Sequence, residues 1–314
     1  MNYKWLLIFL AFSIQIACST NTAHRTTKAP PIQLIKNIAP GYFHPQWMPD
    51  GKHLLVTGVE NRGLYLIDIQ NESTRTLTKD RKAGNNIAIS DDGQHLAYQG
   101  SELTQRRRMH AIHLLDIDGN KKTIYKGRPP CKVLQFAKGK LYYLADNTLH
   151  AYDLESGQDE MHPDITLGYS DSDLHLVWYS EKEAHIIDPL EKGKYIWASM
   201  SPAEPLLVFN RAGLGTHVCD ASGKLLADLG RLHATQWTPD GQWLIGMDDY
   251  DNGMAYTASD IIRISKAGRQ RTNLTEHSSV IALYPRLSPD GTRIAFSSPE
   301  GWMYLMPVPP ITKD

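Results

Sequence analysis

Cysteine is scarce in this sequence, with three among 314 residues, which excludes a small domain held together by disulfides. Neither sign of charge dominates, because 33 Lys and Arg residues are balanced by 34 Asp and Glu residues. Such a balance gives no electrostatic reason to expect nucleic acid as a partner. The composition, 41% hydrophobic and 21% charged, also excludes a disordered chain, a collagen and a multi-span membrane protein.

Several catalytic motifs are also missing. The chain has no Gly-x-Ser-x-Gly elbow, no Walker loop, no dinucleotide-binding glycine motif and no His-Glu-x-x-His zinc motif. No window shows a long 3.6-residue period, so we expect almost no helix. The missing catalytic motifs favour a non-catalytic role.

The first 18 residues read as an export signal. Lys4 precedes an apolar run from Trp5 to Ile16 that is too short to span a bilayer but fits a secretory segment. Ile16-Ala17-Cys18 resembles a bacterial lipobox, although Gln15 stands where such sites usually carry Leu. We therefore expect lipid attachment at Cys18, followed by a flexible tether over 19–31. Cleavage near Ala17 with release into the periplasm is the alternative.

A repeat runs through the rest of the chain. Trp47-Met-Pro-Asp-Gly51 recurs as Trp237-Thr-Pro-Asp-Gly241 and as Leu287-Ser-Pro-Asp-Gly291, with more worn copies between them. Seven copies give a mean spacing of about 40 residues, a period typical of propellers and solenoids. The shared turn residues are structural in this interpretation, because Pro presets φ and Gly accepts a positive φ. They are Pro49, Asp50, Gly51, Pro239, Asp240, Gly241, Pro289, Asp290 and Gly291.

Each copy predicts four short strands, so we expect an all-β propeller of four-stranded antiparallel blades. Seven blades fit the spacing best, and six remain open because the middle copies are closely spaced. Prolines follow Met306, so we expect the last blade to lack a fourth strand of its own. Residues 32–36 are predicted to form a strand that belongs to no other blade. Pairing the two would close the ring and remove both edges. We expect one propeller over 32–310 and a short tail over 311–314.

The Pro-Asp-Gly motifs Trp237–Gly241 and Leu287–Gly291 resemble those of the TolB-like family of WD40-like, PD40-repeat propellers. Asn273-Leu-Thr275 and the segment Asp251–Asp260 also resemble this family. The segment is similar to that of lipid-anchored members from Bacteroidetes-type bacteria. The resemblance covers about residues 32–308 and is specific for fold. Ser19, after the cysteine, resembles an outer-membrane-directed lipoprotein. We therefore expect an exported lipoprotein, on the outer membrane facing the periplasm, that docks proteins of the cell envelope. The family resemblance is weak for function, because related propellers serve as docking modules, as lyases and as regulatory domains of peptidases.

The candidate partner face lies where the innermost strands begin, because loops on a rigid scaffold usually carry recognition. It comprises Tyr42, His44, Gln46, Trp197, His233, Gln236, Tyr284 and Arg286. Carbohydrate binding, or metal-dependent polysaccharide-lyase activity, is the alternative. Oligogalacturonate-lyase propellers hold a metal with channel histidines and a glutamine, and His44, Gln46, His233 and Gln236 could face the axis in that way.

A second, weaker metal candidate is calcium at Asp248, Asp249 and Asp251, whose oxygen ligands are closely spaced. The plain alternative is a polar loop between the second and third strands of the sixth blade. We therefore expect no cofactor, with calcium or a channel-bound divalent metal as the exception. The sequence does not identify the partner or the glycan.

Overall fold

The computed structural model describes residues 31–104, 107–191 and 193–311. The predicted signal segment, Cys18 and nearly all of the tether lie outside the described residues. No helix in the described part of the chain is long and apolar enough to cross a membrane.

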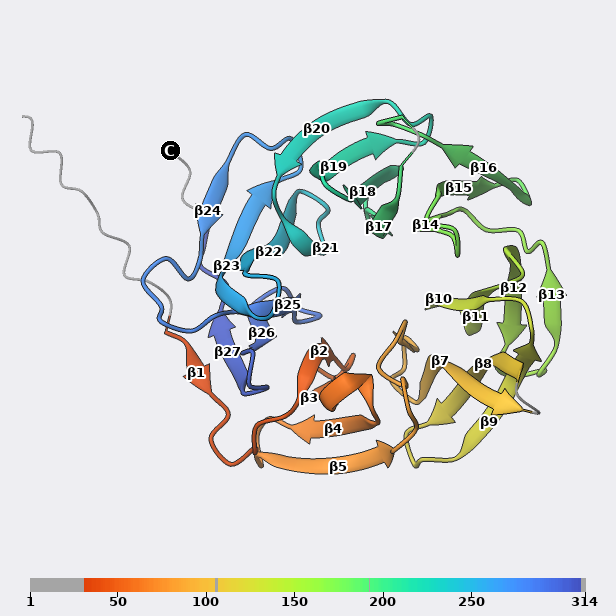
Figure 1. The fold of residues 1–314 in the computed structure, drawn as a ribbon, viewed down its shortest axis with the longest axis horizontal. Coiled ribbons are helices and arrows are strands. Elements are labelled where there is room, and N and C mark those ends of the chain that lie inside the picture. Colours follow the sequence, from red (N-terminus) through yellow and green to blue (C-terminus); the bar gives the residue numbers. More distant parts are fainter. Residues whose placement is uncertain (1–30, 105–106, 192, 312–314) are drawn as a thin grey trace, which may run out of the picture.

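Seven antiparallel sheets stand around a central axis like the blades of a propeller, which confirms the all-β prediction and the count of seven (Figure 1). Blades one to three are β2 (Phe43–Trp47), β3 (His53–Thr57), β4 (Leu64–Asp68), β5 (Ser73–Thr78); β6 (Ala88–Ile89), β7 (His95–Thr104), β8 (Arg107–Asp116), β9 (Lys121–Gly127); and β10 (Cys131–Ala137), β11 (Lys140–Ala145), β12 (Thr148–Asp153), β13 (Asp159–Met161). Blades four and five are β14 (Leu167–Ser170), β15 (Leu176–Ser180), β16 (Glu183–Ile187); and β17 (Tyr195–Met200), β18 (Leu206–Arg211), β19 (Gly215–Asp220), β20 (Leu225–Gly230). Blades six and seven are β21 (His233–Trp237), β22 (Trp243–Asp251), β23 (Tyr256–Ser265), β24 (Arg271–Asn273); and β25 (Leu283–Leu287), β26 (Arg293–Ser297), β27 (Met303–Pro307), β1 (Gln33–Leu34). Among the described residues the one helix is a single 3-10 turn, η1 (Val59–Asn61).

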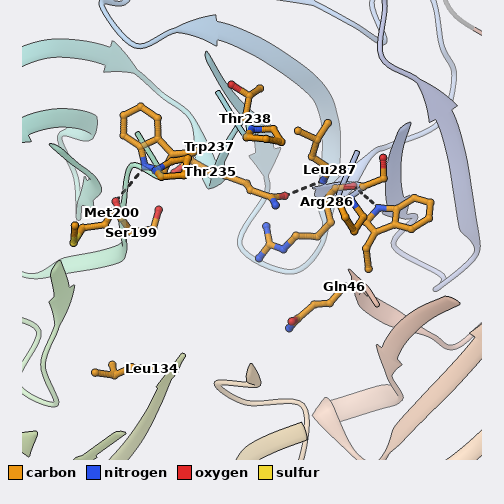
Figure 2. A pocket seen from close by; sticks show the side chains of 15 residues that line it. Gln46, Leu134, Ser199, Met200, Thr235, Trp237, Thr238, Arg286 and Leu287 are labelled. Carbon is orange, nitrogen blue, oxygen red and sulfur yellow. Dashed lines mark hydrogen bonds between the residues drawn. The ribbon is translucent and has the colours of Figure 1, made fainter. Parts of the chain in front are cut away.

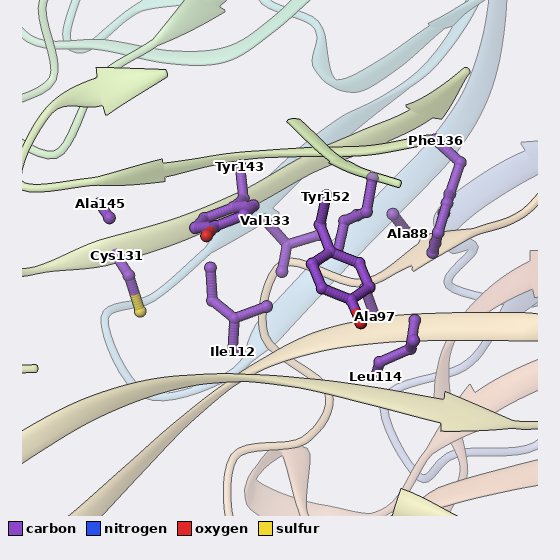
Figure 3. Packing of buried hydrophobic residues seen from close by; sticks show 11 residues of the cluster. Ala88, Ala97, Ile112, Leu114, Cys131, Val133, Phe136, Tyr143, Ala145 and Tyr152 are labelled. Carbon is purple, nitrogen blue, oxygen red and sulfur yellow. The ribbon is translucent and has the colours of Figure 1, made fainter. Parts of the chain in front are cut away.

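The hydrophobic core lies between the blades. Each cluster of buried side chains draws on two successive sheets; one joins β8 to β10 and β11 through Ile112, Val133 and Tyr143 (Figure 3). The second strand of a blade is therefore covered on both faces, which explains its continuous apolar runs, such as Leu54-Leu-Val56 in β3. Outer strands such as β5 are mostly exposed.

The N-terminal strand closes the ring, as predicted. Gln33 and Leu34 of β1 pair with Leu305 and Tyr304 of β27, and the amide of Ile35 donates to the carbonyl of Met303 at 3.0 Å. Blade seven is thus completed by residues from the opposite end of the described chain, so that β27 is paired on both sides and β1 is the outer strand of the sheet.

The Pro-Asp-Gly segments form the turns expected from the sequence. Gly51, Gly241 and Gly291 have φ of 63°, 65° and 72°, and each carboxylate before them accepts a backbone N–H two residues ahead. Hydrogen bonds from Ser288 and Thr292 lower the pKa of Asp290 to about 2. The aspartates therefore fix the turns as acceptors.

Blade four differs from the predicted four strands, because only β14, β15 and β16 occur in the described part of it. Pro189 and Gly193 stand in the segment where a fourth strand would follow β16. Proline has no N–H for a ladder and glycine weakens a strand, so this segment is poorly suited to pairing.

Candidate functional site

Four innermost strands carry the same irregularity at the point where they approach the axis. The pairing register shifts between Phe43 and Gln46, Ile196 and Ser199, His233 and Gln236, and Leu283 and Arg286. One residue inside each shift has a left-handed backbone, with φ between 48° and 53°: His44, Trp197, Ala234 and Tyr284. These bulges belong to blades one, five, six and seven, which are neighbours in the ring.

Side chains at the bulges form aromatic contacts across blade boundaries. The ring centroid of His44 lies 4.0 Å from that of Tyr284, and the ring centroid of Trp197 lies 5.1 Å from that of His233. Behind them, the Tyr284 hydroxyl is 3.0 Å from the Tyr256 hydroxyl. We call His44, Trp197, His233 and Tyr284 the rim.

Trp197 is the most exposed member of the rim. Its exposed fraction is 40%, whereas the tryptophans Trp47 and Trp237 are buried between blades. Their indole N–H groups donate to the carbonyls of Arg286 and Ser199, at 2.9 and 3.2 Å, and so join each blade to the one before it. An aromatic ring at a bulge and open to solvent is available for contact with a ligand.

Two residues after each left-handed residue, a polar side chain lines the axis: Gln46, Ser199, Gln236 and Arg286. They surround a cavity of about 640 Å³, shown in Figure 2 with the Arg286 and Gln46 side chains extending into the open space. A second cavity of about 400 Å³ shares Leu134, Ser199, Met200 and Arg286 with the first. Together the two cavities take residues from every blade and make up the central channel.

Arg286 dominates the electrostatics of the channel. Its Nη1 donates to the carbonyls of Ala234 and Pro285, both at 3.1 Å, and no acidic residue of the described chain forms an ion pair with it. Burial lowers the pKa of its guanidinium, which nevertheless stays charged near neutral pH. Burial, and then the charge of Arg286, lower the pKa of His44 to about 4. His44 is therefore neutral at physiological pH.

The remaining histidine of the rim is oriented by a carboxylate. Nδ1 of His233 lies 2.7 Å from Oδ1 of Asp249, whose side chain is buried. This contact fixes the ring against Trp197.

The structure brings most of the predicted face together, but not all of it. Gln46, Gln236 and Arg286 line the channel, and Trp197 lines its second cavity. The rim residues His44, His233 and Tyr284 lie two or three positions earlier on the same innermost strands. Tyr42 lies apart, because its ring packs edge-on against Tyr65 at 5.1 Å, beside the core between blades seven and one.

Sequence reasoning missed Ser199 and Lys132, which also line the channel. The repeat could have revealed Ser199, because it precedes Pro202 by three residues, as Gln46, Gln236 and Arg286 precede Pro49, Pro239 and Pro289. Lys132 lies in blade three, whose worn copy lacks that proline.

The three calcium candidates do not share one site. Asp248 accepts hydrogen bonds from Arg231 and Arg271, both at 2.8 Å, Asp249 contacts His233, and Asp251 accepts the amide of Gly253 at 2.8 Å. All three lie on the long strand β22 and not in the loop envisaged from the sequence. Neighbours on a strand point to opposite faces, so this arrangement does not favour a common ion.

One other group could hold a metal among the described residues: Asp171, Asp173 and His175, with potential ligand atoms within 4.8 Å of one another. Oδ1 of Asp171 accepts the amides of Asp173 and His175, at 2.9 and 2.8 Å. It therefore occupies the place of the turn aspartates in blade four, and a turn explains the cluster.

Comparisons with known proteins agree with this architecture. No protein-family model matches the chain, and no curated protein matches it either. Among solved structures, a chain of the mitotic checkpoint complex is similar, with a TM-score of 0.60 and 14% identity over 98% of this chain and 99% of that chain. The Cps50 (Swd1) β-propeller domain of Myceliophteria thermophila has a TM-score of 0.59 and 12% identity, covering 89% of this chain and all of that domain. The chain is thus a seven-bladed, WD40-like β-propeller.

Proposed function

We propose that this protein is a non-catalytic docking propeller whose rim binds a protein partner. The observation that carries the proposal is the exposed Trp197, held at a left-handed bulge and packed on His233. Exposed tryptophan beside a rigid opening is the kind of side chain that dominates binding energy at protein interfaces. One of the similar propellers also comes from a protein complex, the mitotic checkpoint complex.

The finer identity belongs to the same proposal. The repeat motifs support membership of the TolB-like, PD40-repeat propellers of Bacteroidetes-type bacteria. The lipobox-like Ile16-Ala17-Cys18 supports lipid anchoring through Cys18, and Ser19 supports placement on the outer membrane, facing the periplasm. The partner is then a protein of the cell envelope.

Affinity purification from native envelopes tests this proposal. A tagged copy should bring down a defined protein in near-equal amount. Trp197→Ala should weaken that complex roughly 30-fold, in line with the ~2 kcal/mol of an interface hot spot. Ala234 occupies the equivalent bulge in blade six, so alanine is compatible with this backbone.

The matched control is Leu214→Ala, because Leu214 is also exposed, at 57%, but lies in the turn between β18 and β19. It should leave the complex unchanged. Cys18→Ala should release the protein from the membrane fraction while preserving the complex. Absence of a stable partner, or equal capture by the Trp197→Ala variant, would reject docking at the rim.

Carbohydrate binding is the competing proposal, because an exposed tryptophan can also stack on a sugar ring. Its lyase version requires a divalent metal among His44, Gln46, His233 and Gln236. The charge of Arg286, which lines the same channel, opposes a divalent cation there. A metal assay on purified protein separates the two versions, since stoichiometric bound metal would favour the lyase.

A further inference from the structure

The two channel cavities differ in charge from the molecule as a whole. The protein carries nearly equal numbers of acidic and basic residues. The residues lining the cavities, in contrast, include Arg286 and Lys132 but no aspartate or glutamate. The channel is therefore locally positive, although the overall composition gives no reason for it.

Arg286 has hydrogen-bonding capacity that the protein leaves unused. Only Nη1 has partners, and both are neutral carbonyls; within the described ranges Nε and Nη2 form no hydrogen bond. A guanidinium group keeps its proton in proteins, so Arg286 cannot become neutral. Arg286 is a half-buried cation without a counter-charge, and partial desolvation strengthens its attraction for an anion that enters the channel.

Neutral donors lie around the same space. The Oε1 atom of Gln236, a residue that lines the cavity, accepts the amide of Leu287 at 2.8 Å, and its NH₂ group forms no hydrogen bond with any described residue. The hydroxyl of Ser199 is buried and has no hydrogen-bond partner. The amide of Gln46 forms no side-chain hydrogen bond with any described residue, and in Figure 2 it extends into the cavity.

Lys132 supplies the second cation. Its Nζ donates to the carbonyl and hydroxyl oxygens of Ser170, at 2.5 and 3.0 Å, on the wall of the second cavity. These acceptors are neutral as well. The wall thus presents two cations and several unused donors. No carboxylate lines it, although the charge of Asp171 acts on Lys132 from behind Ser170.

We propose that the central channel is a binding site for an oxyanion, a carboxylate or phosphate group, held by Arg286 and the amide and hydroxyl donors around it. Guanidinium groups bind such oxyanions with two parallel hydrogen bonds. Cavities of about 640 and 400 Å³ have the size of small-molecule sites. The site goes beyond docking at the rim, because it requires no protein partner.

Titration calorimetry and thermal unfolding with sodium phosphate and sodium citrate test the site, against sodium chloride at equal ionic strength. We expect saturable binding and a rise in Tm for at least one of the two anions. Arg286→Gln should weaken that binding at least tenfold while keeping or raising the Tm of the ligand-free protein. Arg62→Gln is the matched control, because it removes the same charge at an exposed position after η1, and it should bind as the parent does.

Gln46→Glu provides a second variant, in case Arg286→Gln does not fold. It places a carboxylate on the wall that carries Arg286 and should abolish anion binding by supplying the counter-charge internally. A response to citrate alone assigns the site to carboxylates, and a response to phosphate alone assigns it to phosphate groups. No saturable response to either anion, or full binding by the folded Arg286→Gln or Gln46→Glu variant, would overturn the proposal.

Discussion

Four bulge residues hold a backbone conformation that side chains other than glycine rarely adopt. His44, Trp197, Ala234 and Tyr284 all have φ near 50°, and each such residue costs about 1–3 kcal/mol. Strain of this kind persists only where the surrounding structure imposes it. Here the adjoining blades support it, because the indole N–H groups of Trp47 and Trp237 donate to backbone carbonyls just beyond two of the bulges.

The protonation of His44 should make the protein sensitive to acid. The unfolded chain binds a proton near pH 6.5, whereas the folded chain binds it only near pH 4. Between these values the unfolded state holds more protons, so stability falls as pH falls through this window. His44→Asn should reduce the change in the free energy of unfolding between pH 7 and pH 4 by up to about 3 kcal/mol. The reduction is smaller to the extent that water in the channel screens the charge.

Urea unfolding at a series of pH values measures the effect. Asparagine accepts a left-handed backbone and does not titrate, so it isolates the charge from the geometry. An unchanged slope of unfolding free energy against pH in the variant would show that His44 is protonated as readily in the folded state as in the unfolded state.

Several residues of the candidate site could be identified from the sequence. Gln46, Gln236 and Arg286 share one position of the repeat, and that position faces the channel in the structure. Lys132 could not be found in the same way, because its blade has lost the proline that sets the alignment. Bulges and unsatisfied donors depend on pairing between strands, which no local pattern reveals.

Among the elements, the Pro-Asp-Gly turn of blade six packs closely against blade five. A Cβ at Gly241 would lie 2.8 Å from the hydroxyl oxygen of Ser201 and 2.9 Å from the Cβ of Ala203 in blade five. Gly139, in the turn between β10 and β11, also has a positive φ, 72°, but open space around it. Gly241→Ala should therefore destabilise the protein by at least about 1 kcal/mol more than Gly139→Ala, which adds backbone strain alone.

Chemical denaturation of the two variants gives the comparison. Equal losses of stability in Gly241→Ala and Gly139→Ala would mean that a side chain at position 241 makes no steric clash with blade five. In that case backbone strain would be the whole effect.

The closing strand offers a second prediction for an element. Ile35 follows β1 and is only 2% exposed, packed in the core between blades seven and one. Ile35→Ala should lower the free energy of unfolding by about 2–4 kcal/mol, as expected for a truncated core residue. Gln33→Ala, in the exposed part of the same strand, should change it by less than about 0.5 kcal/mol.

Urea denaturation again supplies the measurement. If Ile35→Ala were as mild as Gln33→Ala, the seam would contribute little to stability, and the ring would depend on contacts elsewhere.

The elements themselves were largely predictable. Turn residues and alternating strands recur from Trp47 to Met306, and the closing pair was visible as a missing strand at one end and a spare one at the other. Blade four was the exception, because its worn repeat gave no sign that an outer strand is absent from the described part of that blade. The prediction of four strands there rested on its neighbours and not on its own residues.

For the whole molecule, the three-stranded blade should be the place where the ring opens first. Cys219 packs against blade four, beside Trp178 and Ile187, whereas Cys131 lies between blades two and three. Both thiols are free and buried, and burial raises the pKa of each to about 12. Alkylation therefore reports opening of the surrounding core.

In urea below the unfolding transition, Cys219 should react with iodoacetamide faster than Cys131, as read by peptide mass spectrometry. Equal rates would show that the ring unfolds as one cooperative unit. Faster labelling of Cys131 would place the weak point between blades two and three.

The equivalent bulges bear on how such a ring can change what it binds. Histidine, tryptophan, alanine and tyrosine share a positive φ near 50° at equivalent positions in four neighbouring blades. Position in the blade, and not the identity of the residue, thus determines the backbone there. Each of the four positions therefore accepts different side chains without a change in the backbone. A library randomised at residues 44, 197, 234 and 284 should yield new binding specificities on the same scaffold.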